Sequence, residues 1–269
     1  MATINLTTAL RTEYENLFNS CVIRPERVSI VNDTIAALQS GNERYVKVSK
    51  AMGIPWHFVA VIHNMEASRN FGSHLHNGDP LTNRTIQVPA GRPKTGMPPF
   101  TWEDSATDAL AMKGLGSQTD WSLAGILYQL ERYNGFGYRQ YHPQVKSPYL
   151  WGFSNHYTSG KYVADGTWSD IAVSKQCGAA VLLRRMAETG VIDFADQPAP
   201  KPGAQPIVVR HSMKKPTDPL EVPKAEKLQQ WLNTFPGIFV KPDGIPGDRT
   251  SDAFKKVTGV YLPGDPRGR

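Results

Sequence analysis

The feature that most constrains the fold is an apolar run that directly follows a Gly-Ile-Pro break at residues 53–55. The run WHFVAVIHNME, residues 56–66, has apolar side chains nearly all round a helix rather than along a single stripe. Such a helix is stable only when other elements cover it on every side. The sequence therefore predicts a mainly helical domain that surrounds residues 56–66, with Glu66 at the end of the run.

Segments before and after this run have the periodicity expected of the covering helices. Residues 26–50 carry one apolar stripe, which is broken near Gly41. The last of the segments begins at Ser169 or Asp170, which are good N-caps, and Gly190 follows its end. We expect helices over residues 26–50, 103–113, 120–132 and 169–188.

A different composition separates the buried run from the later helices. Residues 70–93 are rich in Gly, Asn, Asp, Pro and Thr, and the short stretch TIQVPA alternates between apolar and polar side chains. These are signals of turns and short strands, so we expect an irregular hairpin or a small sheet here. The predicted fold class is mainly α, in the α+β sense, with a small β-hairpin region.

Two carboxylates stand in contrasting contexts. Glu66 lies where an apolar helix meets a polar segment, so loss of water should raise its pKa, as a general acid requires. Asp79, thirteen residues later, lies in a Gly-Asp-Pro turn that should be wet, so it should stay ionised. A protonated and an ionised carboxyl group together are typical of glycosidases. The plain alternative is a surface glutamate and an ordinary turn aspartate.

These carboxylates, with Tyr133-Asn134-Gly135 after a later helix, resemble the lysozyme superfamily. The nearest branches are goose-type lysozymes and lytic transglycosylases, which carry Glu-Ser at the end of a buried helix and a later Tyr-Asn-Ala-Gly motif. This chain departs from both motifs, because Ala67 separates Glu66 from Ser68 and Gly135 replaces the alanine. The segments HLHNGDPLTNRT and VPAGRP also resemble a group of bacterial and phage lysozyme-like proteins.

The resemblance covers about residues 25–190. It implies a peptidoglycan hydrolase, an N-acetylmuramidase that cleaves the β-1,4 bond between muramic acid and glucosamine. Glu66 would protonate the leaving oxygen, and Asp79 would orient water or stabilise developing positive charge. No metal or organic cofactor is implied. The substrate-binding residues would be Ser68, His76, Thr82, Tyr133 and Asn134.

A proline-rich stretch at residues 196–223 indicates a semi-rigid linker, which we place at residues 196–219 between a catalytic domain, residues 1–195, and a tail. The tail, residues 220–269, resembles a short helical peptidoglycan-binding domain. Gly247 could take a positive φ, and Asp248 or Thr250 could cap a following helix. The alternative is a structural appendage. The resemblance rests on Leu228-Gln229, Leu232-Asn233, Asp243-Gly244-Ile245-Pro246-Gly247 and Thr250.

Charge and hydropathy bound the partners and the location. The net charge is +6, and from Lys201 onward 12 basic and 7 acidic residues give +5. A basic tail suits nucleic acid, a membrane surface or an anionic polymer such as cell wall. With the resemblance, we expect a monomer whose partner is the peptidoglycan glycan strand, with no nucleic acid and no membrane span. Without a recognisable secretory signal, we expect a cytoplasmic product that is released or exported to the periplasm or cell wall.

Several rival functions remain open. A lytic transglycosylase would use Glu66 as both acid and base. A peptidase would use Cys177 with a histidine, although Cys177 lies on an apolar stripe that favours burial. His74 and His76 with Asp79 could hold a metal, although such residues in a polar loop usually bond to their neighbours. A wall-binding protein without catalysis is the last rival.

Overall fold

The computed structural model describes residues 4–194 and 208–268. These residues divide into two compact units, of which the first comprises Met1–Tyr14 and Val22–Leu183 and the second comprises Glu15–Cys21 and Arg184–Arg269. The division falls within two helices, α1 (Thr8–Asn19) and α9 (Ala179–Glu188). It therefore differs from the predicted boundary near residue 195. The predicted linker lies partly outside the described residues.

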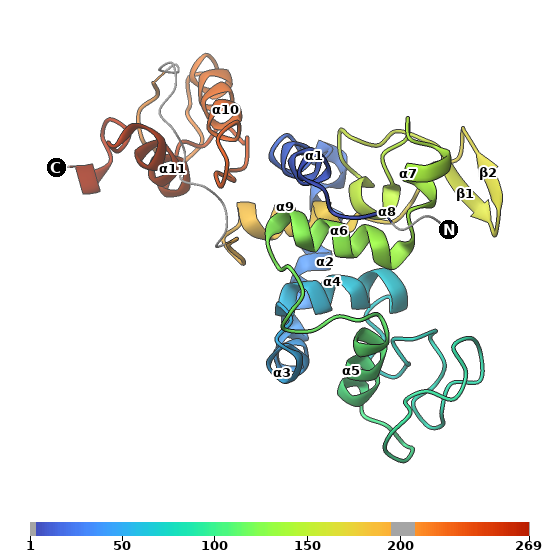
Figure 1. Cartoon of the computed structure of the whole chain (residues 1–269). Helices are drawn as coiled ribbons and strands as arrows, with labels where there is room; N and C mark the ends of the chain where they lie inside the picture. The colour runs from blue at the N-terminus through green and yellow to red at the C-terminus, as the bar shows by residue number, and fades with distance from the viewer. Residues whose placement is uncertain (1–3, 195–207, 269) are drawn as a thin grey trace. The chain divides into compact units, whose positions relative to one another are not determined.

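The centre of the first unit is helix α4, Trp56–Ala67, in which every residue from His57 to Met65 is buried. It contacts α2 (Val28–Ser40) and α3 (Asn42–Met52), which are drawn beside it in Figure 1. The chain breaks between α2 and α3 at Gly41. The prediction of a buried central helix, flanked by a stripe that breaks at Gly41, is confirmed.

Helices α5 (Trp102–Met112) and α6 (Leu123–Asn134) confirm two further predicted segments. Each has a side-chain N-cap, because Thr101 accepts a hydrogen bond from the Asp104 N–H at 3.1 Å and Ser122 accepts one from the Gly125 N–H at 3.0 Å. Two short helices follow, α7 (Gly137–Tyr141) and α8 (Pro148–Trp151). None of the helices in the described part of the chain combines the length and apolar character that crossing a membrane requires.

Helix α9 begins ten residues later than predicted, at Ala179. Ser169 lies in a strand, and the carboxylate of Asp170 accepts a hydrogen bond from Trp168 Nε1 at 2.7 Å, so neither residue is the N-cap. Residue 178, just before the helix, has to be a glycine because a Cβ there would lie 2.2 Å from the Leu150 carbonyl oxygen. This close approach comes from α8, and nothing in the local sequence announces it.

The sheet also differs from its predicted place. Strands β1 (Lys161–Ala164) and β2 (Thr167–Ser169) form an antiparallel hairpin in which Tyr162 faces Trp168. Within residues 70–93 the structure has no strand, only a single bridge between Ser73 and Pro80. Prolines there supply no N–H, and side chains take up backbone N–H groups that a strand would use. A mainly helical chain with one small hairpin is therefore correct, but the hairpin lies elsewhere.

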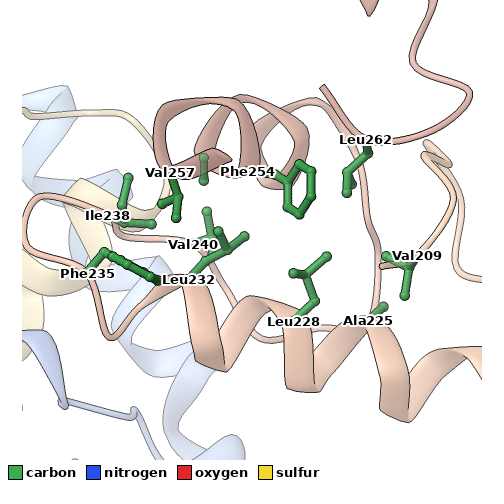
Figure 2. Packing of buried hydrophobic residues seen from close by; sticks show 11 residues of the cluster. Val209, Ala225, Leu228, Leu232, Phe235, Ile238, Val240, Phe254, Val257 and Leu262 are labelled. Atoms are coloured by element: carbon green, nitrogen blue, oxygen red, sulfur yellow. The ribbon is translucent and has the colours of Figure 1, made fainter. Parts of the chain in front are cut away.

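Helices α10 (Glu221–Leu232) and α11 (Asp248–Thr258) form the C-terminal part of the second unit. The two helices contact each other around a small apolar core, which Figure 2 shows from close by. This part of the chain is small and helical, as predicted. The core side chains include Leu228, Leu232, Val240, Phe254, Val257 and Leu262.

The polar residues of the tail motif hold the loop between these helices. Gln229 is buried, and its Oε1 accepts hydrogen bonds from the N–H groups of Asp243 and Gly244, each at 2.9 Å. Its Nε2 donates to the Ile245 carbonyl at 3.0 Å. Gly244, not Gly247, has the positive φ, at 74°, so that prediction is wrong. Gly247 is itself the N-cap of α11.

Candidate functional site

Glu66 lies at the C-terminal end of α4, where the chain turns away sharply. Ser68 and Arg69 both take left-handed conformations, with φ of 48° and 66°, and the N–H of each bonds to the His63 carbonyl. This closes the helix one residue after Glu66. Ser68 is exposed at the turn. The end of the buried helix therefore brings one carboxyl group out of the core to the surface.

The environment of Glu66 favours its protonated form. The residue is exposed to solvent, yet enough protein surrounds the carboxyl group that loss of water raises its pKa above the ordinary value. A hydrogen bond from Tyr149 and the positive charge of Lys113 oppose this shift without cancelling it. The result is an accessible carboxyl group that can still carry a proton, which is the property of a general acid.

Tyr149, from α8, fixes one oxygen of this carboxyl group. Its hydroxyl donates a hydrogen bond to Glu66 Oε1 at 2.7 Å. Burial and the charge of Glu66 raise the pKa of Tyr149 well above its usual value, so the phenol remains a donor. Within the described residues, Oε2 of Glu66 has no hydrogen-bond partner. That oxygen is free to hold the proton and present it to a ligand.

Two more residues face this group from the ends of α5 and α6. Burial raises the pKa of the Tyr133 phenol, and the nearby charge of Glu66 adds to this rise. Lys113 Nζ lies 4.8 Å from the centre of the Tyr133 ring. Asn134 is exposed at the last position of α6. The structure thus brings Tyr133 to Glu66, as the sequence suggested, and adds a cation.

Gln176 joins a fifth segment to the end of α4, because its Nε2 donates to the Met65 carbonyl at 3.0 Å. Gln176 thus holds its segment against the residue that precedes Glu66.

Cys177, the next residue, is the cysteine that a peptidase would need. It is 6% exposed, and its thiol donates to the Gly178 carbonyl at 3.7 Å. Burial of this kind suits a small core residue.

Asp79 is engaged by its own loop. Its Oδ2 accepts hydrogen bonds from the N–H groups of Ile86 and Gln87, at 2.7 and 3.0 Å, and from Asn77 Nδ2 at 3.0 Å. The bond from Gln87, followed by that from Ile86, lowers the pKa of Asp79. No hydrogen bond or ion pair among the described residues joins Asp79 to Glu66. The expectation of a wet turn is wrong, because Asp79 is buried and the hydrogen bonds from its own loop, rather than water, favour its ionised form. Its carboxylate holds the loop together.

The two histidines of this segment pack it onto α5. The side chain of His76 has no exposed surface, and its Nε2 bonds to Asp108 Oδ2 at 2.8 Å. His74 bonds to Ser105 Oγ through Nδ1 at 2.8 Å. Neither ring shares a metal-type cluster with Asp79 among the described residues. His76 therefore offers no surface to a sugar, whereas Thr82 is exposed.

Sequence reasoning missed Tyr149, Lys113 and Gln176 as members of this site. Tyr149 stands in a tract already dense in aromatic residues, and it meets Glu66 across 83 positions of the chain. Its only local signal is Ser147-Pro148, a typical helix start. Such a signal predicts α8 but not the carboxyl group toward which α8 directs its tyrosine.

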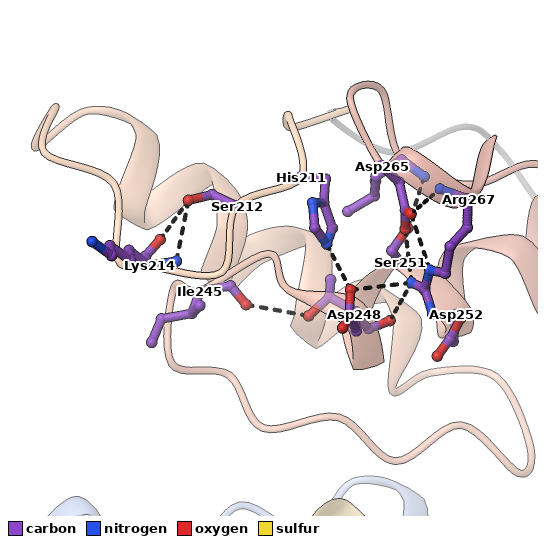
Figure 3. Close-up of polar contacts among 11 residues, drawn as sticks. His211, Ser212, Lys214, Ile245, Asp248, Ser251, Asp252, Asp265 and Arg267 are labelled. Atoms are coloured by element: carbon purple, nitrogen blue, oxygen red, sulfur yellow. Dashed lines mark hydrogen bonds and ion pairs between the residues drawn. The ribbon is translucent and has the colours of Figure 1, made fainter. Parts of the chain in front are cut away.

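A second polar cluster lies in the C-terminal part, as Figure 3 shows. Ligand atoms of His211, Asp248 and Asp265 lie within 4.8 Å of one another. The guanidinium of Arg267 pairs with Asp265 at 2.7 Å and with Asp248 at 3.4 Å, and this arginine lowers the pKa of Asp265. An arginine thus supplies the positive charge that a metal would bring, and the cluster clamps the chain end onto α11.

The chain matches no family model, no curated protein and no solved structure. Function therefore has to be argued from the group around Glu66. The convergent residues are Glu66, Lys113, Tyr133, Tyr149 and Gln176, from five segments of the first unit.

Proposed function

We propose that this protein cleaves the glycan strand of bacterial peptidoglycan at a β-1,4 bond, as an N-acetylmuramidase, with Glu66 as general acid. The observation that carries the proposal is the accessible Glu66 carboxyl group whose pKa burial raises and whose Oε1 Tyr149 holds. Its position, at the end of a buried helix, agrees with the resemblance to lysozyme-superfamily enzymes. Tyr133, at the end of α6, would line the site.

The chemistry can be written with this one acid. Protonated Glu66 gives its proton to the glycosidic oxygen as the bond between that oxygen and the anomeric carbon breaks. A water oxygen then bonds to the anomeric carbon, and the carboxylate of Glu66 takes up the proton that the water loses. Lys113 stabilises the carboxylate that forms between the two steps, because its positive charge favours ionised Glu66.

The direct test is Glu66→Gln, which keeps the shape of the side chain and removes its proton. General acid catalysis contributes about 10²–10⁴-fold, so glycan release from purified sacculi should fall by roughly that factor. Glu26→Gln is the matched control, because Glu26 is an exposed glutamate in a short helical turn before α2. Equal activity of Glu66→Gln and the control would refute the proposal.

A lytic transglycosylase is the second candidate, and one observation favours it. In the part of the chain that the structure describes, the groups that shift the pKa of Glu66 are Tyr149 and Lys113, and no carboxylate is among them. A transglycosylase needs no second carboxylate, because the 6-hydroxyl of the sugar replaces water as nucleophile and the product is an anhydro ring. The chemical nature of the new glycan ends separates the two enzymes.

For the tail we propose binding to the cell wall. The loop between α10 and α11 depends on Gln229, so Gln229→Ala leaves the N–H groups of Asp243 and Gly244 without their partner, which costs about 1–3 kcal/mol each. In a full chain that also carries Glu66→Gln, this change should reduce retention on sacculi. Gln230→Ala, at the exposed neighbour, should not. Retention that is equal in both variants would contradict wall binding through this loop.

A further inference from the structure

Three highly exposed apolar side chains lie on the loop of residues 84–97, between α4 and α5. Ile86, Val88 and Met97 are 83%, 89% and 80% exposed. Among the other large apolar side chains of the described residues, Ile171 is exposed to a similar degree, at 89%, and Leu220 follows at 71%. Figure 1 shows this segment as an irregular trace beside α5. Three such residues within one loop are more than the singly scattered apolar side chains that are normal on a protein surface, and they indicate an interaction site.

The backbone of the 84–97 loop is held in place from within. Thr85 and Arg92 close it, because the Thr85 N–H donates to the Arg92 carbonyl at 2.8 Å and the Arg92 N–H donates to Thr85 Oγ1 at 2.9 Å. Asp79 holds the N–H groups of Ile86 and Gln87. The apolar side chains are thus presented outward on a preorganised loop, so a partner pays little ordering entropy.

The segment that carries these side chains has only basic residues of its own. Residues 80–101 contain Arg84, Arg92 and Lys94 and no acidic residue. Two carboxylates lie next to the segment, and both are engaged within the protein. Asp79 accepts hydrogen bonds from the loop backbone, and Asp108 pairs with His76 and Arg92. Lys94 is exposed. Arg84 and Arg92 are half-buried and bond to the Gly96 carbonyl and to Asp108, so the 84–97 loop offers its apolar groups beside one exposed cation, Lys94.

We propose that the 84–97 loop docks on a lipid bilayer with anionic headgroups, a property independent of the chemistry at Glu66. Aliphatic side chains that project from a surface gain free energy when they enter the boundary between headgroups and acyl chains. The exposed ammonium group of Lys94 beside them is attracted to the negative surface of such a bilayer. A glycan strand, with its hydroxyl groups, would leave Ile86 and Val88 in contact with polar atoms.

The test measures flotation of the full-length chain with vesicles of phosphatidylcholine that contain about one quarter phosphatidylglycerol. The variant Ile86→Ser/Val88→Ser/Met97→Ser should bind at least about tenfold more weakly than the unmodified chain. Ile171→Ser removes an equally exposed side chain from another place and should bind unchanged. Lys94→Gln should weaken binding less than the triple variant and only at low salt. Equal melting temperatures would show that the fold survives each change.

Two results would overturn the proposal. The unmodified chain could fail to bind these vesicles, or the triple variant could bind them equally well. In the second case, a loss of retention on sacculi by the triple variant would make the cell wall the partner of the 84–97 loop.

Discussion

At the scale of single residues, the protonation of Glu66 depends on a balance that mutations can shift in a known direction. Burial raises its pKa, whereas the Tyr149 hydroxyl and the Lys113 charge lower it. A general acid works while it is protonated, so activity should fall as the pH rises through the pKa of Glu66. Any change that removes a group favouring the carboxylate should extend activity to higher pH.

Tyr149→Phe applies this reasoning. The change removes the hydrogen bond that stabilises ionised Glu66, so the pKa of Glu66 should rise further and the alkaline limb of the pH–rate profile should move to higher pH. The maximal rate should fall by about tenfold or less, because the carboxyl group is positioned less firmly. Tyr141→Phe, at a tyrosine that is 66% exposed on α7, is the control. A shift of the limb to lower pH would contradict the assignment.

Asp79 shows where residue-level reasoning from the sequence stops. The sequence predicted an ionised Asp79 in a wet turn, and the lowered pKa agrees in direction, but the residue is buried and the cause is backbone N–H groups rather than water. Its partners were not predictable, because the N–H groups of Ile86 and Gln87 reach it only when the loop folds back. Its catalytic role stays a prediction, and the hydrogen bonds on its Oδ2 give that role no support.

At the scale of elements, two buried histidines in α4 make the free energy of unfolding depend on pH. His57 and His63 each have their pKa lowered to about 4 by burial, from 6.5. The unfolded chain therefore binds more protons below about pH 6.5, so the free energy of unfolding should fall as the pH drops from about 6.5 toward 4. Each histidine can contribute a loss of about 3 kcal/mol across that range.

His57→Leu should reduce this dependence, since a leucine has no proton to gain on unfolding. Urea unfolding followed by circular dichroism between pH 7 and 4.5 measures it, and the variant should lose less stability on acidification than the unmodified chain. An identical pH dependence in both proteins would show that His57 is not held neutral in α4.

The elements that the sequence predicted well are those with local causes. Apolar periodicity and capping residues are local, so α2 to α6 appear where they were expected. Two features next to the mispredicted elements depend on distant groups: Gly178 lies against the Leu150 carbonyl, and Asp79 takes the backbone N–H of Ile86. Pattern reading therefore found the end of α4 and missed Tyr149, which comes to it from α8.

At the scale of the whole molecule, the proposed cleavage and the proposed binding belong to different units. Glu66 and its partners lie in the first unit, and the Gln229 loop lies in the second. Charge is not divided in the same way, because the first unit and the second unit each carry +3 of the total +6. Loss of catalysis and loss of wall retention should therefore be separable by single substitutions in the full chain.

The central claim is that this protein breaks a glycosidic bond, and the ends of its products test that claim most directly. Purified peptidoglycan is digested in water enriched in ¹⁸O, and the fragments are identified by mass spectrometry. We predict new muramic acid reducing ends that carry ¹⁸O, absent with Glu66→Gln; anhydro ends without the label would identify the transglycosylase. New amino termini on cut stem peptides, with the glycan strands intact, would contradict the account.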